Sequence, residues 1–121
     1  MITILLLVIA AISNAIMDVL NNFFSVSKFK NLNPMFWNQN ISYLNKWADY
    51  GLKKEKFLGS STVFVAFTDG WHLFKAIWLV SIIGAIISAW YTEPLFGWYT
   101  APLLFVLWGL CFEASFRYLK K

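Results

Sequence analysis

The fold is decided by the stretch Thr68-Asp69-Gly70-Trp71-His72-Leu73-Phe74-Lys75 and by the apolar run that follows it. Residues 76–92 include no charged side chain. A run of this length is typical of a helix that crosses the hydrocarbon core of a bilayer, which is about 30 Å thick. Asp69, His72 and Lys75 are spaced three residues apart, so a helix places them on one face where the span begins. Ionisable side chains held against a membrane are costly, and they predict a functional site.

The composition places the whole chain in a membrane. Its 121 residues are 60% hydrophobic and 13% charged, whereas soluble domains carry about 25% charged residues. The net charge of +4 does not indicate nucleic-acid binding, because the lysines are interleaved with aromatic residues, a pattern typical of a membrane surface. The single cysteine, Cys111, excludes a disulfide framework and a paired-cysteine redox motif. We expect membrane lipids as partners and no nucleic acid.

The apolar runs predict an all-α membrane protein, a single integral domain with three transmembrane helices at about residues 2–24, 60–91 and 95–118. Ser60 or Ser61 would cap the start of the second helix. Residues 27–59 are the only extended polar section. Their mixture of lysines and aromatic residues predicts a segment that lies along the membrane surface.

The basic residues predict how the helices are oriented. With three spans, all ten Lys and Arg residues fall on the side where the first and third spans end, while Glu93 is the one charged side chain on the other side. Cytoplasmic segments of membrane proteins carry an excess of Lys and Arg. We therefore expect a multi-pass protein of the inner (plasma) membrane, with the N-terminus outside, the C-terminus inside and residues 27–59 on the cytoplasmic face.

The same orientation brings four ionisable residues to a similar depth, namely Asp18, Asp69, His72 and Glu113. Carboxylates with one imidazole suit a divalent metal such as zinc or manganese, and Asp69 and His72 at i and i+3 can face one ion. The alternative is that Asp69 pairs with His72 or Lys75 and only neutralises charge at the interface. For Glu113, an ion pair with Arg117 at i+4 is the stronger interpretation.

Asp18 continues a polar face of the first span that also contains Asn14 and Asn21. No basic residue lies within one helical turn of Asp18 in the sequence, and the helix dipole at that end disfavours a carboxylate. A polar face on a membrane helix is expected to turn toward other helices or water. We therefore expect Asp18, Asp69 and His72 to share a metal, a proton or a substrate phosphate.

Three functions remain open. The first is a metal-dependent hydrolase or transferase acting on a lipid or lipid-linked substrate at the cytoplasmic interface. Its expected residues are, as catalytic groups, Asp18, Asp69, His72 and Lys75; as substrate-binding groups, Asn14, Asn38 and Lys46; and as metal ligands, Asp18, Asp69, His72 and Glu113. The second is a non-catalytic accessory or assembly subunit, which would bind a partner membrane protein. The third is a proton or ion pathway, for which three spans would need a homo-oligomer.

Three segments resemble parts of small, uncharacterised membrane proteins of bacteria and phages: Phe36-Trp37-Asn38, Asn45-Lys46-Trp47 and Thr68-Asp69-Gly70-Trp71-His72-Leu73-Phe74-Lys75. The resemblance covers about residues 14 to 76, and the third segment carries it most specifically. It implies no activity, cofactor or fold.

Overall fold

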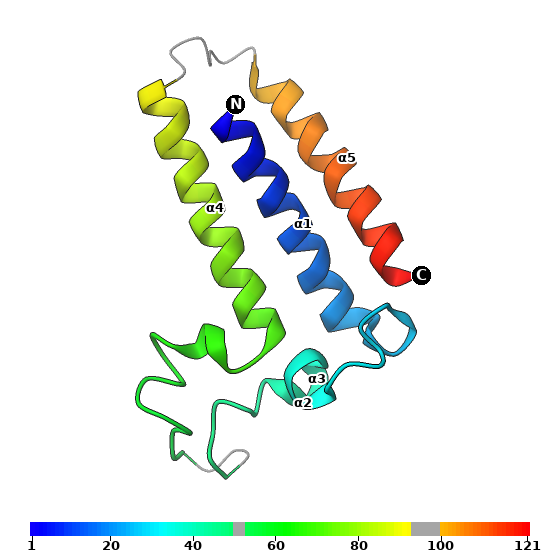
Figure 1. The fold of residues 1–121 in the computed structure, drawn as a ribbon, viewed down its shortest axis with the longest axis vertical. Coiled ribbons are helices and arrows are strands. Elements are labelled where there is room, and N and C mark those ends of the chain that lie inside the picture. Colours follow the sequence, from blue (N-terminus) through cyan, green and yellow to red (C-terminus); the bar gives the residue numbers. More distant parts are fainter. Residues whose placement is uncertain (50–52, 93–99) are drawn as a thin grey trace.

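The computed structural model describes residues 1–49, 53–92 and 100–121, and the regular secondary structure of this part of the chain is helical. Its three long helices are α1 (Ile2–Asn22), α4 (Gly70–Thr92) and α5 (Ala101–Lys120). By length and composition, all three could cross a membrane. Figure 1 shows α1 lying between α4 and α5. The prediction of an all-α chain with three apolar helices is confirmed.

Small side chains are buried in both α1 and α4, and Gly84 of α4 lets the two helices approach closely. Ala11 and Ala15 of α1 are fully buried, and Ala85 of α4 is 3% exposed. At Gly84, an added Cβ would lie only 3.2 Å from the side chain of Leu6. Inside a bilayer, small residues allow helices to approach closely, and van der Waals packing then stabilises their association. No residue of α5 is buried, so the protein core lies mainly along α1.

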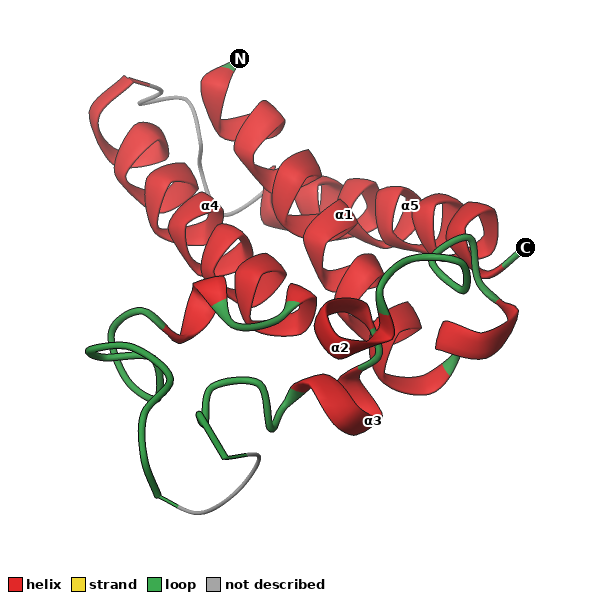
Figure 2. Cartoon of the chain, turned by 60° about the horizontal axis from the view of Figure 1, so that its bottom comes forward, coloured by secondary structure: helices red, strands yellow, loops and turns green. Residues whose placement is uncertain are grey.

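The connector between α1 and α4 folds under one end of the helices (Figure 2). It contains the short helices η1 (Phe24–Val26), α2 (Pro34–Trp37), α3 (Gln39–Ser42) and η2 (Val65–Phe67). The Asn38 side chain caps α3 by accepting a hydrogen bond from the backbone N–H of Asn40 (3.2 Å). Trp37 stacks on Phe29, with 5.4 Å between ring centroids, and lies 6.3 Å from the ring of Phe74 in α4. These aromatic contacts attach the connector to the base of α4.

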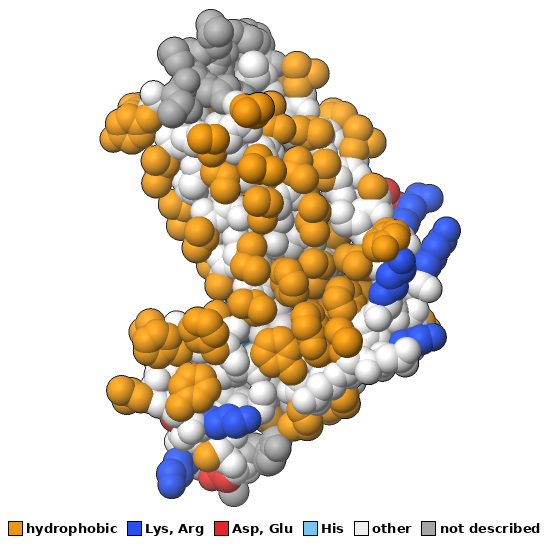
Figure 3. All heavy atoms as spheres, viewed as in Figure 1, with side chains coloured by type: hydrophobic (Ala, Val, Ile, Leu, Met, Phe, Trp, Pro, Cys, Tyr) orange, Lys and Arg blue, Asp and Glu red, His pale blue; other side chains and the backbone are white. Residues whose placement is uncertain are grey.

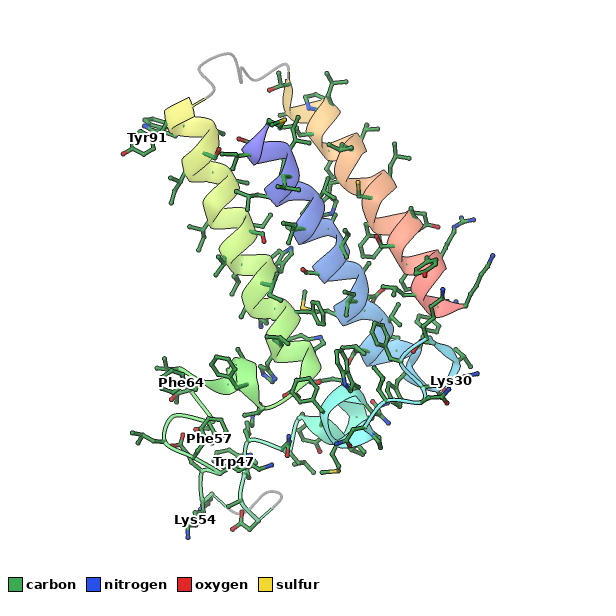
Figure 4. All side chains as sticks on the ribbon, viewed as in Figure 1. Lys30, Trp47, Lys54, Phe57, Phe64 and Tyr91 are labelled. Carbon is green, nitrogen blue, oxygen red and sulfur yellow. The ribbon has the colours of Figure 1, made fainter. Side chains whose placement is uncertain are left out.

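A second part of the connector projects away from the helices, as Figure 4 shows around Trp47, Lys54, Phe57 and Phe64. Glu55 organises its turn: its carboxylate accepts hydrogen bonds from the Ser61 hydroxyl and from the backbone N–H groups of Gly59 (3.0 Å) and Ser61 (3.2 Å). These bonds favour the charged form, first the Ser61 hydroxyl and then the two N–H groups, and they lower the pKa of Glu55 below its ordinary value.

The second long helix begins at Gly70, and the sequence prediction of a start near Ser60 is wrong. The Ser60 hydroxyl instead donates to the backbone carbonyl of Lys46 (2.7 Å), and Ser61 bonds to Glu55. Both candidate caps are therefore used inside the connector. The predicted end of the first span at residue 24 is two residues beyond Asn22, where α1 ends. The predicted start of the third span at residue 95 lies outside the described residues.

The basic residues gather at one end of the molecule (Figure 3). Every Lys and Arg belongs to the connector, to the beginning of α4 or to the end of α5. The opposite end, where α1 begins and α4 ends, carries none of them in the sequence. The two groups of segments that the sequence separates by charge therefore lie at opposite ends of the three long helices.

Candidate functional site

Asp69 and His72 form a hydrogen-bonded pair at the first turn of α4. Asp69 is fully buried, and its Oδ1 accepts the backbone N–H of His72 (2.9 Å), which caps the helix. Its other oxygen, Oδ2, lies 2.6 Å from Nδ1 of the His72 ring, whose side chain is 19% exposed. The carboxylate thus fixes the orientation of the imidazole and leaves Nε2 as the ring nitrogen that can exchange a proton with a bound molecule.

Residues of the connector form hydrogen bonds next to this pair. The Thr68 hydroxyl lies 2.7 Å from the Val65 carbonyl and 3.2 Å from Oδ2 of Asp69, so its one proton is shared between these two acceptors. The backbone carbonyl of Thr68 accepts a hydrogen bond from the Asn45 amide (2.5 Å). Asn45 in turn accepts from the Lys56 amine (2.6 Å). A buried carboxylate is tolerated when hydrogen bonds replace its hydration. The backbone N–H and ring Nδ1 of His72 contact the Asp69 carboxylate, whereas the bonds of Asn45 and Lys56 hold the Thr68 backbone next to it. The sequence alone did not place Asn45 beside the pair.

An open cavity of about 370 Å³ lies where α1, α4 and α5 meet. Its lining consists of Asn14, Met17, Asp18, Asn21, Trp71 and Phe112; we call it the interhelical cavity. Four of these six residues belong to α1, and three of the four form the polar face predicted from the sequence. The polar face therefore turns toward a space between helices, as expected for polar side chains on a membrane helix.

Trp71 connects the interhelical cavity with the Asp69–His72 pair. Its indole lines the cavity, and its ring centroid lies 5.0 Å from that of His72 in an edge-on contact. The Lys75 amine lies 4.8 Å from the centroid of the same indole, close enough for a cation–π interaction. An imidazole and an amine thus contact an indole that lines the same cavity as a carboxylate and two amides. The sequence placed Trp71 between functional residues but indicated no role for it.

Asp18 keeps its carboxylate within the polar face of α1. Its Oδ1 accepts a hydrogen bond from the amide of Asn22 (2.8 Å), one helical turn away. It shares the lining of the interhelical cavity with Trp71, although the described contacts of Asp69 and His72 do not include it. Direct sharing of a ligand by Asp18 and His72 stays a prediction.

The expected metal ligands do not assemble. Among the described residues, no group of three or more His, Cys, Asp and Glu side chains lies close enough to hold a metal ion. Asp69 and His72 come together, but Asp18 is bonded to Asn22, and Glu113 pairs with Arg117 (2.5 Å). Each outlying carboxylate finds a partner four residues away on its own helix. The described residues therefore give the expected zinc or manganese ion no set of three ligands, and its binding stays a prediction.

Two residues expected to bind substrate also have other positions. Asn38 caps α3, and neither Asn38 nor Lys46 lines the interhelical cavity. The Lys46 amine lies 5.8 Å from the ring centroid of Trp47, in the projecting part of the connector. Phe112 of α5 lines the cavity instead, and no sequence signal distinguishes it from the other apolar residues of that helix.

No protein family, curated protein or solved structure matches the chain. The resemblance of residues 68–75 to bacterial and phage membrane proteins therefore stays a prediction.

Proposed function

We propose that this chain is an integral membrane protein that binds the polar head group of a lipid or lipid-linked substrate in the interhelical cavity. We further propose that it acts on this substrate as a hydrolase or transferase. The observation that supports the proposal most is the polar face of α1, since Asn14, Asp18 and Asn21 line an open cavity at the end of an apolar helix. Head groups of membrane lipids lie near this depth, and an ionisable side chain in a membrane helix indicates a functional site.

Each side chain near the interhelical cavity has a role in this proposal. Asp18 and the two asparagines accept hydrogen bonds from hydroxyl or amine groups of the substrate. His72 is the general base, because Asp69 holds its Nδ1 and leaves Nε2 as the nitrogen that can take a proton. The Lys75 amine, beside Trp71, neutralises a phosphate oxygen. Asp69 is a positioning residue, since its contacts are with His72, Thr68 and the start of α4.

The proposed orientation places the interhelical cavity in the cytoplasmic leaflet. The N-terminus lies outside and the basic end inside, because lysine and arginine are retained on the cytoplasmic side. In this orientation the connector lies along the membrane surface, with its lysines near lipid phosphates. Each such lysine contributes about 1 kcal/mol near an anionic surface.

The test uses purified protein in vesicles of phosphatidylethanolamine and phosphatidylglycerol supplemented with an isoprenyl diphosphate, and mass spectrometry follows all three lipids. Wild type is expected to consume one of them. His72→Gln should slow this reaction by about 10²-fold or more. Asp69→Asn retains a good helix cap but removes the orienting charge, so it should also slow the reaction and change its pH profile.

The matched control is Glu113→Gln, which removes a carboxylate from α5 that does not line the interhelical cavity. Its rate should equal that of wild type. Stability of the lipids in the presence of wild type, or equal rates for wild type and His72→Gln, would contradict the proposed reaction.

A second candidate is a non-catalytic accessory subunit. The observation that favours it is that both carboxylate oxygens of Asp69 contact other groups of the same chain. Capping of α4 and the pair with His72 are sufficient to explain why an aspartate is buried here. In that case His72→Gln should lower the thermal stability of the protein in detergent and reduce co-purification of a partner membrane protein, with every lipid left intact.

A further inference from the structure

A second, chemically different groove lies at the end of α5. It has a volume of about 520 Å³ and is lined by Val26, Arg117, Lys120 and Lys121. We call it the basic groove. None of these residues lines the interhelical cavity or contacts the Asp69–His72 pair. The two sites therefore offer opposite charges, a carboxylate in the interhelical cavity and three cations here.

The cations around the basic groove are held in place by neighbouring groups. The backbone N–H of Lys28 donates to the carbonyl of Leu119 (2.9 Å) and ties the connector to the last turn of α5. The Lys28 amine lies 3.2 Å from the ring centroid of Tyr118, and the Lys120 amine lies 4.0 Å from that of Phe23. Cation–π contacts restrict lysine side chains that would otherwise be mobile, so less entropy is lost when they bind an anion.

The charge balance still favours an anion. Glu113 pairs with Arg117 and offsets that one cation, although both side chains are exposed. The C-terminal end of the α5 dipole also disfavours an anion. Against these two terms stand three amines, those of Lys28, Lys120 and Lys121. The first two lie over aromatic rings. The local excess is therefore positive.

The groove combines this charge with apolar surface at the membrane boundary. Val26 in its lining is 57% exposed. The rings of Phe23 and Phe116 contact each other and lie 4.0 and 5.6 Å from the amine of Lys120, which lines the groove. Figure 4 shows that the connector near Lys30 reaches the end of α5, where the apolar part of the helix stops. A molecule that fits both features has a negative head and an apolar tail.

We propose that the basic groove binds an anionic phospholipid, with its phosphate held by Lys120, Lys121 and Arg117 and its acyl chain against Val26 and Phe116. This site is independent of the proposed reaction, because its residues take no part in the interhelical cavity. It would attach the end of α5, which has no buried residue of its own, to the anionic surface of the leaflet.

The test measures lipid binding to the detergent-purified chain by native mass spectrometry, with phosphatidylglycerol and phosphatidylcholine of identical acyl chains as the probes. Wild type is expected to bind the first phosphatidylglycerol about tenfold more tightly than phosphatidylcholine, given the contribution of each lysine near an anionic lipid. The double variant Lys120→Gln with Lys121→Gln should lose this preference. Lys120→Arg with Lys121→Arg should retain it, which also shows that the site tolerates substitution.

The matched control is Lys53→Gln with Lys54→Gln, which removes the same charge from the projecting part of the connector. It should leave the preference unchanged. An equal loss in this control would show a diffuse charge effect and overturn the proposal. Competition by glycerol phosphate at the same concentration as the lipid would also overturn it, because the ligand would then be a free phosphate.

Discussion

Gly70 shows how one residue sets the start of α4. A Cβ added at this position would lie 3.0 Å from Cε3 of Trp37, 3.3 Å from a methyl group of Leu20 and 3.4 Å from the carbonyl of Phe36. The glycine therefore lets α1, α2 and α4 meet directly beside the Asp69 cap. The requirement is for space, since the neighbouring atoms include backbone and a ring that is itself packed on both sides.

We expect Gly70→Ala to destabilise the protein by about 1–3 kcal/mol, because overpacking of a close contact forces its neighbours to move. Gly109→Ala is the control, since an added Cβ there meets no atom within 4 Å. That substitution should be neutral or stabilising by up to about 1 kcal/mol, as expected for glycine in a helix interior. Equilibrium unfolding in mixed detergent micelles measures the free energy of unfolding of both variants. Equal changes in the two would contradict the close contact at Gly70.

At the scale of elements, the connector is an ordered part of the fold. It has its own caps, an aromatic cluster around Trp37 that packs on α4, and a turn built on Glu55. This organisation explains why α4 begins ten residues later than the apolar pattern indicates. The hydroxyls at positions 60 and 61 are hydrogen-bonded within the connector, so the cap of α4 is left to Asp69.

The Glu55 turn should weaken in acid. Since its hydrogen bonds lower the pKa of Glu55 in the folded chain below the reference value of 4.5, the charged form stabilises the turn above that value. This stabilisation is lost as the pH falls below 4.5 and through the folded pKa. The NMR shifts of the Gly59 and Ser61 amides should follow this titration, and Glu55→Gln should abolish it. A midpoint at or above the reference value would disprove the assignment.

At the scale of the whole molecule, the two ends differ in charge and in structure. The end that holds the connector carries all the lysines and arginines, the interhelical cavity and the basic groove. The sides of α4 and α5 expose large apolar residues such as Val80, Ile86, Leu103 and Phe105. Such surface is too extensive for water, and lipid chains are its natural surroundings.

The proposed orientation predicts which positions a membrane-impermeant maleimide can reach in intact cells. In a Cys111→Ser background, cysteine at position 2 should react without lysis, whereas cysteine at positions 54 and 121 should react only after the membrane is opened. The reason is that lysine- and arginine-rich segments stay in the cytoplasm. Labelling of position 54 or 121 in intact cells would refute the N-out orientation.

The sequence by itself determined the three apolar helices and the collection of basic residues at one end, because helix length, hydropathy and charge order are local properties. It also indicated the Asp69–His72 pair, since i and i+3 lie within one helical turn. Only the tertiary structure decided where α4 begins, that Trp71 and Phe112 line one cavity with Asp18, and that Asp18 and Glu113 do not join the Asp69–His72 pair. These features depend on how each helix is rotated about its axis and on contacts between residues far apart in the chain. The spacing of polar residues shows that a helix has a polar face, but it does not determine which neighbouring helix that face contacts.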